Sequence, residues 1–149
     1  MYEELLTPIK KDLEKYGYRL QQPAMEAEIK LLESNAKKEL GAALPPEYIS
    51  LLCEVNGLDY NGFVFYATHT LNITGFEDRT IEGFVEANMA FRDVDRFRDF
   101  LVFGGDGEVL YVYRLSAKKY LSIDAVALDE ADPYGSFREM LQGAIDTHA

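Results

Sequence analysis

The chain has 149 residues, of which 48% are hydrophobic and 13% aromatic, which is enough for the packed core of one domain and excludes a disordered protein. Residues 1–41 carry eight acidic and seven basic side chains, and residues 42–149 carry eighteen acidic and eight basic ones, so the second part holds nearly all of the net charge of −11. Nucleic acids and anionic membranes require clustered Lys and Arg, so this charge argues against both and favours a basic partner protein.

Two helices are predicted at the start of the chain. Apolar residues at helical spacing indicate a first helix over residues 3–16, ended by Gly17. Its start has two interpretations, because Thr7 and Pro8 also fit an N-cap and a first helical residue. A second helix is predicted from residue 23 to residue 40, followed by Gly41 as a left-handed C-cap.

A short third helix has clear start and stop signals. It begins within Leu44-Pro45-Pro46-Glu47-Tyr48, where Pro46 fits the first turn because an N–H at that position would have no helical partner. Apolar residues at helical spacing follow up to Val55 and predict one buried stripe. Asn56-Gly57 then supplies two residues that tolerate left-handed backbone angles, as the end of a helix often requires.

The remaining chain changes from helical to extended patterns. Residues 62–66 and 71–73 predict strands, and a helical pattern returns over Thr80 to Phe91. Three further strands, at residues 100–103, 109–113 and 120–123, predict an antiparallel meander, in which Gly104-Gly105-Asp106-Gly107 forms the first turn. Ser136 and Glu139 match a capping box for the last helix. The sequence therefore predicts one α+β domain over residues 1–149.

The order of these segments resembles the SUKH superfamily, more narrowly its YrhA-like branch. The resemblance rests on Leu44-Pro45 with Tyr48 and Asn56-Gly57, on Phe100 to Tyr113 around the Gly-rich turn, and on Ser136-Phe137, and it covers most of residues 24–145. It implies helices packed against a central antiparallel sheet. It also implies an immunity protein that blocks a partner toxin, often a nuclease, whereas other relatives are regulatory or scaffolding proteins. The family has no catalytic motif to transfer.

The residues typical of catalysis form no recognisable arrangement in the sequence. His69 and His148 have no Cys or second His at metal-ligand spacing, and no nucleophile-elbow motif surrounds a serine. The segment from Gly104 to Glu108 is similar to the signature of diguanylate cyclases, but Gly107 stands where that signature has a second acid, which favours a tight turn. We therefore expect no enzyme and no cofactor or metal.

Cysteine content and the N-terminal segment bear on the location of the protein. The single cysteine, Cys53, excludes an internal disulfide, and its place in the short helix predicts a buried thiol. Charged residues interrupt the apolar residues near the N-terminus, so no signal-peptide core is recognisable, and no stretch reaches the length of a membrane span. We expect a cytoplasmic protein.

Acidic residues in the second part offer a candidate partner-binding surface. The predicted surface consists of Asp124, Asp129, Glu130 and Asp132, joined by Asp106 and Glu108 of the Gly-rich turn and by Asp59 and Tyr60 after the short helix. The spacing of the acids does not fit a calcium loop. Two interpretations remain: solvated loops that keep the protein soluble, or an acidic rim that faces a basic partner. Similarly, Tyr111, Tyr113 and Tyr120 fit either ligand stacking or cross-strand pairs.

The leading hypothesis is an immunity protein of the SUKH type. It would bind a cognate toxin with a basic surface and cover the active or substrate-binding surface of that toxin, by steric and electrostatic blockade. The alternative is a non-catalytic regulatory or scaffolding module that binds another protein.

Overall fold

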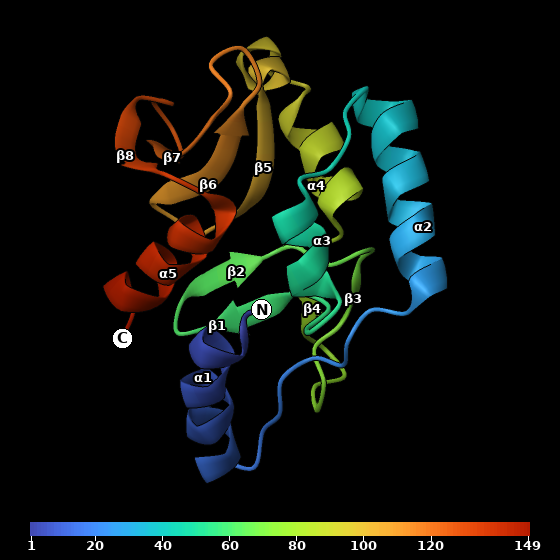
Figure 1. Cartoon of the computed structure of the whole chain (residues 1–149), viewed down its shortest axis with the longest axis vertical. Coiled ribbons are helices and arrows are strands. Elements are labelled where there is room, and N and C mark those ends of the chain that lie inside the picture. Colours follow the sequence, from blue (N-terminus) through green and yellow to red (C-terminus); the bar gives the residue numbers. More distant parts are fainter.

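A computed structural model describes residues 1–149 as an α+β fold (Figure 1). The helices are α1 (Glu3–Lys15), α2 (Glu26–Asn35), the π-helical turn η1 (Ala36–Leu40), α3 (Pro46–Leu52), α4 (Phe84–Phe91), the 3-10 helix η2 (Asp95–Asp99) and α5 (Phe137–Thr147). The strands are β1 (Leu58–Tyr60), β2 (Phe63–Phe65), β3 (Leu71–Asn72), β4 (Thr80–Ile81), β5 (Phe100–Gly105), β6 (Val109–Arg114), β7 (Lys119–Asp124) and β8 (Glu130–Tyr134). None of the helices is both long and apolar enough to cross a membrane.

Six of the strands form one antiparallel sheet in the order β1-β2-β5-β6-β7-β8, and β3 pairs with β4 in a separate hairpin. The predicted meander of β5, β6 and β7 is confirmed, but its first turn begins at Asp106, because Gly104 and Gly105 continue β5 and pair with β2. Within it Tyr113 lies opposite Tyr120 with ring centroids 4.8 Å apart, and Tyr111 stacks on Phe65 of β2 at 5.2 Å. The interpretation of these tyrosines as neighbours within the sheet therefore holds.

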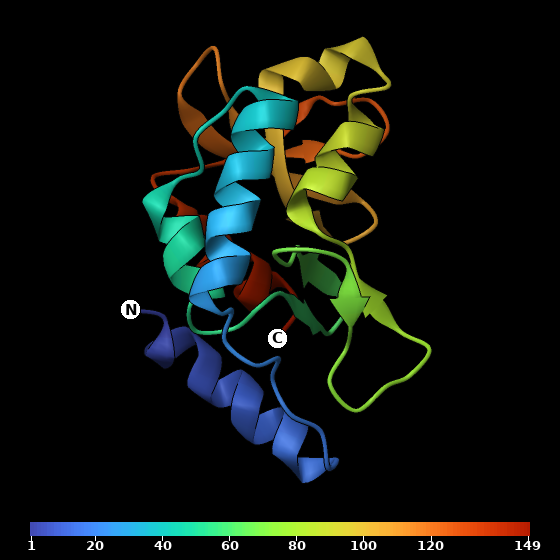
Figure 2. The same cartoon turned by 90° about the vertical axis from the view of Figure 1, so that its right-hand side faces the viewer.

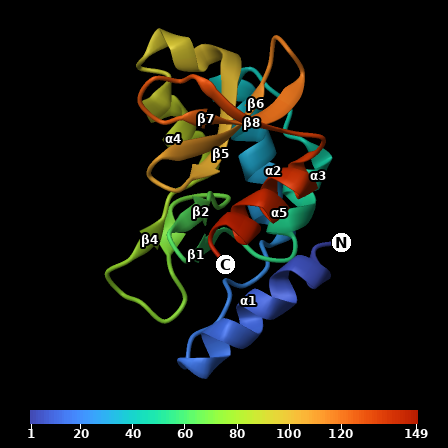
Figure 3. The ribbon, with the colours of Figure 1, turned by 90° about the vertical axis from the view of Figure 1, so that its left-hand side faces the viewer.

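Helices cover one face of the sheet. Figure 2 shows α2 in front and α1 along the bottom, and Figure 3 shows α5 between the strands β5 to β8 and α1. Tyr48 of α3 lies at the centre of this main core, with its ring 5.5 Å from Phe137 and 5.0 Å from Phe103. Its hydroxyl donates a 2.7 Å hydrogen bond to the carbonyl of Tyr66, so the buried hydroxyl is satisfied.

A smaller core lies on the other face of β5, β6 and β7. Phe97 of η2 and Leu128, in the connection between β7 and β8, cover this face. The sheet is therefore buried on both sides along its central strands, which explains their continuous apolar sequence.

Several predicted helix ends are confirmed by the structure. Pro46 is the first residue of α3, and Gly41 follows η1 with a left-handed φ of 65°. The Ser136 hydroxyl accepts a hydrogen bond from the Glu139 N–H at 3.1 Å, as the capping box predicts, while the Glu139 carboxylate accepts from the Gly135 N–H at 2.7 Å instead of from Ser136. The helix α1 begins at Glu3, so Pro8 lies inside it and Thr7 is not its N-cap.

Other predicted elements are wrong because tertiary pairing decides them. Thr80 and Ile81 belong to a strand that pairs with β3, so the helix predicted from Thr80 begins only at Phe84. The helix predicted from residue 23 begins at Glu26, since the Ala24 N–H bonds instead to the Leu52 carbonyl of α3.

The end of α3 also differs from the prediction. The helix ends at Leu52, three residues before the predicted Val55. Cys53 is exposed rather than buried, because it follows the last residue of α3 and its neighbours fill the core. Asn56 is buried, and its side-chain oxygen accepts a 2.8 Å hydrogen bond from the Thr68 N–H, while only Gly57 has a positive φ. The turn after α3 is therefore fixed by a side chain as well as by glycine.

Candidate functional site

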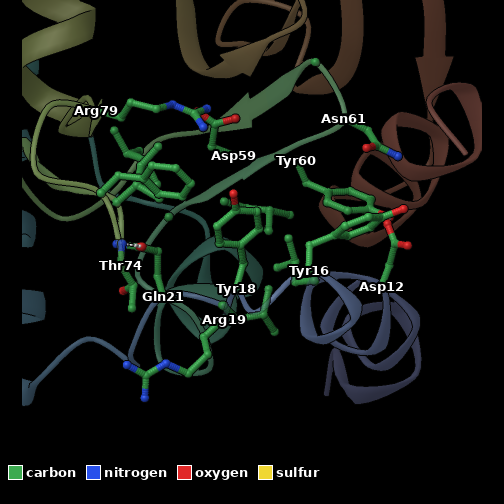
Figure 4. A pocket seen from close by; sticks show the side chains of 18 residues that line it. Asp12, Tyr16, Tyr18, Arg19, Gln21, Asp59, Tyr60, Asn61, Thr74 and Arg79 are labelled. Carbon is green, nitrogen blue, oxygen red and sulfur yellow. Dashed lines mark hydrogen bonds and ion pairs between the residues drawn. The ribbon is translucent and has the colours of Figure 1, made fainter.

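A pocket lies where the end of α1 approaches β1 (Figure 4). It has a volume of about 280 Å³, and its walls are the end of α1, the segment after it, β1, and the connection between β3 and β4. Asp59 and Tyr60, two of the predicted site residues, line it. The other pocket residues used below were not among the predicted ones: Asp12, Tyr16, Tyr18, Arg19, Gln21, Thr74, Phe76 and Arg79.

One end of the pocket is built from an aromatic ring, a cation and a carboxylate. Tyr18 and Phe76 are 5.0 Å apart between ring centroids. The guanidinium of Arg79 lies 4.9 Å from the centre of the Phe76 ring, and its Nη2 lies 3.5 Å from the Asp59 carboxylate. Asp59 is therefore neutralised within the chain.

The other end of the pocket is built from tyrosines and a second carboxylate. The Tyr60 hydroxyl donates a 2.6 Å hydrogen bond to Oδ2 of Asp12. This bond, followed by burial of the phenol, raises the pKa of Tyr60 to about 12. Tyr60 is therefore a stable donor at neutral pH, and it fixes the orientation of the Asp12 carboxylate.

Gln21 holds the β3–β4 side of the pocket in place. Its side-chain oxygen accepts a 2.5 Å hydrogen bond from the Thr74 N–H, and its side-chain nitrogen donates to the Asn72 carbonyl at 3.3 Å. These bonds join the segment after α1 to the β3–β4 hairpin, 51 to 53 residues away. The pocket is thus formed in the free protein, which reduces the entropy lost on binding.

Three of the predicted acidic residues meet at one end of the sheet. Val109 lies opposite Asp124 in the β6–β7 ladder, and the Ala125 N–H bonds to the Glu108 carbonyl at 2.9 Å. The Asp124 N–H in turn bonds to the Asp129 carbonyl at 2.9 Å. Glu108, Asp124 and Asp129 are exposed and form no ion pair, and we call these three residues the acidic end.

The acidic end is locally ordered by Asp124. Its Oδ1 accepts hydrogen bonds from the N–H groups of Val126 at 2.9 Å and Ala127 at 2.7 Å. Both bonds favour the ionised carboxylate and lower the pKa of Asp124, the Ala127 bond most strongly. The charge at this position is therefore retained well below neutral pH.

The remaining predicted residues do not join the acidic end in one rim. The Asp106 carboxylate is 11% exposed and lies 3.1 Å from Nε2 of His148, so it ties α5 to the β5–β6 turn. Glu130 is an ion-pair partner of Arg114 at 2.6 Å and Lys119 at 3.3 Å.

Asp132 is exposed on the edge strand β8, where the sequence predicts a loop. Asp59 and Tyr60 belong to β1, the opposite edge of the sheet.

The side-chain contacts of His69 lie on one ring nitrogen. The Thr68 hydroxyl lies 3.0 Å from Nδ1 of His69, and the Glu28 carboxylate lies 3.6 Å from the same nitrogen. A nucleophile–base–acid relay needs its partners on the two different ring nitrogens. No three His, Cys, Asp or Glu side chains converge in a geometry suited to a metal ion.

The pocket residues left a weak signal in the sequence. The sequence predicts Tyr16 as the last residue of the apolar face of the first helix, but α1 ends at Lys15 and the Tyr16 side chain is exposed. Tyr18 follows Gly17, outside the predicted helix. Asp12 could not be recognised from the sequence, because its place in the pocket depends on the hydrogen bond from Tyr60, 48 residues later. A comparison with protein-family models finds no match, and no curated protein shows significant sequence similarity to the chain. The chemistry of the pocket and of the acidic end is therefore the basis for functional inference.

Proposed function

We propose that the chain is a cytosolic immunity protein of the SUKH type, which binds a basic surface of a cognate toxin and blocks it without turnover. The observation that carries this proposal is the acidic end. Its carboxylates are exposed and have no cationic partner within the chain, so their charge is available to an approaching protein. Such a surface accelerates encounter with a basic partner and selects against acidic ones.

Blockade would be electrostatic and steric. A basic cleft that binds the negative phosphates of a nucleic acid also attracts negative carboxylates. A nuclease toxin would therefore bind the acidic end in place of its substrate. The hydrogen bonds of Asp124 to Val126 and Ala127 hold this surface in one conformation, which limits the entropy lost on binding.

The arrangement of elements is consistent with the resemblance to the SUKH superfamily. Helices pack on a central antiparallel sheet, Pro46 starts a short helix whose Tyr48 is buried, and Ser136 caps the final helix. These features support the proposal through the fold, whereas the acidic end supports it through chemistry.

Co-expression with the product of the adjacent gene tests this proposal. If that product is toxic, the chain should restore cell survival, and a pull-down should recover the complex more efficiently at low salt than at physiological salt. Failure to protect, together with no association at either salt concentration, would reject the immunity function. Capture of a harmless protein would instead support the alternative, a regulatory or scaffolding module.

A further inference from the structure

We infer that the pocket between α1 and β1 binds an arginine side chain presented by the partner protein. This inference deepens the proposed function, on which it rests, because it assigns the partner's basic surface a specific contact. The contact is separate from the acidic end, since none of Glu108, Asp124 and Asp129 lines the pocket.

The pocket already binds one guanidinium from its own chain. Arg79 lies over the Phe76 ring at 4.9 Å and beside Asp59 at 3.5 Å. An aromatic face attracts a cation through its quadrupole, and a carboxylate supplies the opposite charge. This internal contact shows which chemistry the walls of the pocket recognise.

The other end of the pocket repeats this chemistry without a cation. Tyr16 and Tyr60 supply aromatic rings, Asp12 supplies the carboxylate, and Tyr18 stands between the two ends of the pocket (Figure 4). No Lys or Arg of the chain forms an ion pair with Asp12 or lies over any of the three rings. Arg19 also lines the pocket, but its guanidinium points away from Tyr16 and Tyr60 (Figure 4). The charges of Arg79 and Asp59 offset each other, which leaves Asp12 as the uncompensated charge beside the rings.

The free end is accessible and of suitable size. Tyr16 is 70% exposed and Tyr18 is 43% exposed, although large aromatic side chains gain free energy when they are buried. The whole pocket has a volume of about 280 Å³, which is below that of most drug-sized sites and suits one side chain.

Arginine fits this end better than lysine. Its guanidinium is planar, stacks on aromatic rings and offers two parallel N–H donors to a carboxylate. Oδ2 of Asp12 already accepts a hydrogen bond from Tyr60, which orients the carboxylate toward a second partner. A lysine ammonium would gain the charge but not the stacking.

A peptide titration followed by NMR tests the inference on the whole chain. The probe is acetyl-Gly-Arg-Gly-amide, and the matched control replaces arginine with citrulline, which has the same shape without the charge. We expect saturable shifts of the ring resonances of Tyr16, Tyr18 and Tyr60 with the arginine peptide only. Equal shifts with both peptides, or no shifts, would overturn the inference.

Three substitutions test whether the charge and the rings of the pocket bind the arginine peptide. Asp12→Asn keeps an acceptor for the Tyr60 hydroxyl but removes the charge, and we expect about fivefold weaker binding of the arginine peptide. Tyr18→Ala should weaken binding about two- to fivefold through loss of a cation–π contact. Glu14→Gln, an exposed acid on the same helix outside the pocket, is the matched control and should bind normally. If Asp12→Asn and Glu14→Gln bind the arginine peptide with equal affinity, Asp12 does not contribute to the arginine site.

The two proposals fail in different ways. Peptide binding at the tyrosines without rescue from any toxin would leave the arginine site intact and reject the immunity function. Rescue that is unaffected by Asp12→Asn and Tyr18→Ala, with no peptide binding, would retain the immunity function and reject the arginine site.

Discussion

The Tyr60 hydroxyl and the Asp12 carboxylate form a 2.6 Å hydrogen bond that joins β1 to α1 across 48 residues. The opposite end of α1 is held by Tyr2, whose hydroxyl donates to the Glu47 carbonyl at 2.7 Å and whose N–H bonds to Glu54 at 3.0 Å. The helix is therefore attached at both ends, and the pocket exists because α1 is held against β1.

Replacement of Asp12 by alanine should lower the pKa of Tyr60 from about 12 toward 10.0. The hydrogen bond stabilises the protonated phenol, so its contribution to stability is complete below the ordinary pKa and is lost as pH rises through the raised one. Titration of ¹³C-labelled tyrosine rings by NMR measures this value. Glu14→Ala should leave the pKa of Tyr60 unchanged. If Asp12→Ala also leaves the pKa of Tyr60 at the value of the unsubstituted protein, the hydrogen bond does not form in solution.

Charge reversal at the acidic end should slow association with a basic partner. We expect Glu108→Lys with Asp129→Lys to lower the association rate and to flatten its salt dependence, while the free energy of unfolding changes by about 0.5 kcal/mol or less. Glu33→Lys with Glu39→Lys, two exposed acids in α2 and η1, is the control, because it changes the net charge by the same amount. Stopped-flow kinetics at several salt concentrations measures both effects, and equal rates for the two charge reversals would remove the acidic end as a binding surface.

Reversal of Glu130 should act differently, because this residue pairs with Arg114 and Lys119. We expect Glu130→Lys to lower the free energy of unfolding by about 1 kcal/mol, since three cations would then lie together. Urea denaturation measures the change. An effect on stability no larger than that of Asp129→Lys would contradict the assignment of Glu130 to a structural ion pair.

Gly104 should tolerate no side chain. A Cβ built there would lie 1.8 Å from the Val64 carbonyl oxygen, so Gly104→Ala should displace β2 from β5 and cost about 3 kcal/mol of unfolding free energy. Gly107 has a φ of +92° and no neighbour within 4 Å of such a Cβ, so Gly107→Ala should cost only about 1–2 kcal/mol through backbone strain. Urea denaturation of both variants is the test. A larger loss of unfolding free energy in Gly107→Ala than in Gly104→Ala would contradict this account of the two glycines.

Asn88 should be essential for the stability of β5. Its buried side chain accepts from the Val102 N–H and donates to the Val102 carbonyl, both at 2.8 Å. Asn88→Ala should cost about 2–4 kcal/mol of unfolding free energy, because both backbone groups lose their partners in the core. Asn72→Ala, at an exposed site, should change stability little. Similar losses in the two variants would show that water replaces the Asn88 side chain.

The sequence determined the parts of the fold that local chemistry controls. Pro46, Gly41 and Ser136 mark helix ends because capping depends on residues within one turn. The meander was predictable because its strands are rich in apolar and aromatic residues and a tight Gly-rich turn joins the first two. The acidic excess of the second part was likewise a property of composition alone.

Tertiary structure decided the short edge strands and the sites. The strands β1, β4 and β8 have two to five residues and form only because a partner strand lies beside them, so their sequences carry little periodicity of their own. Asp106 was predicted for the surface, but folding places it against His148, which lies 42 residues later. Asp12 meets Tyr60 in the same way. A carboxylate has the same charge wherever it stands in the sequence, and only the fold determines whether a partner within the chain neutralises it or leaves it free to bind another protein.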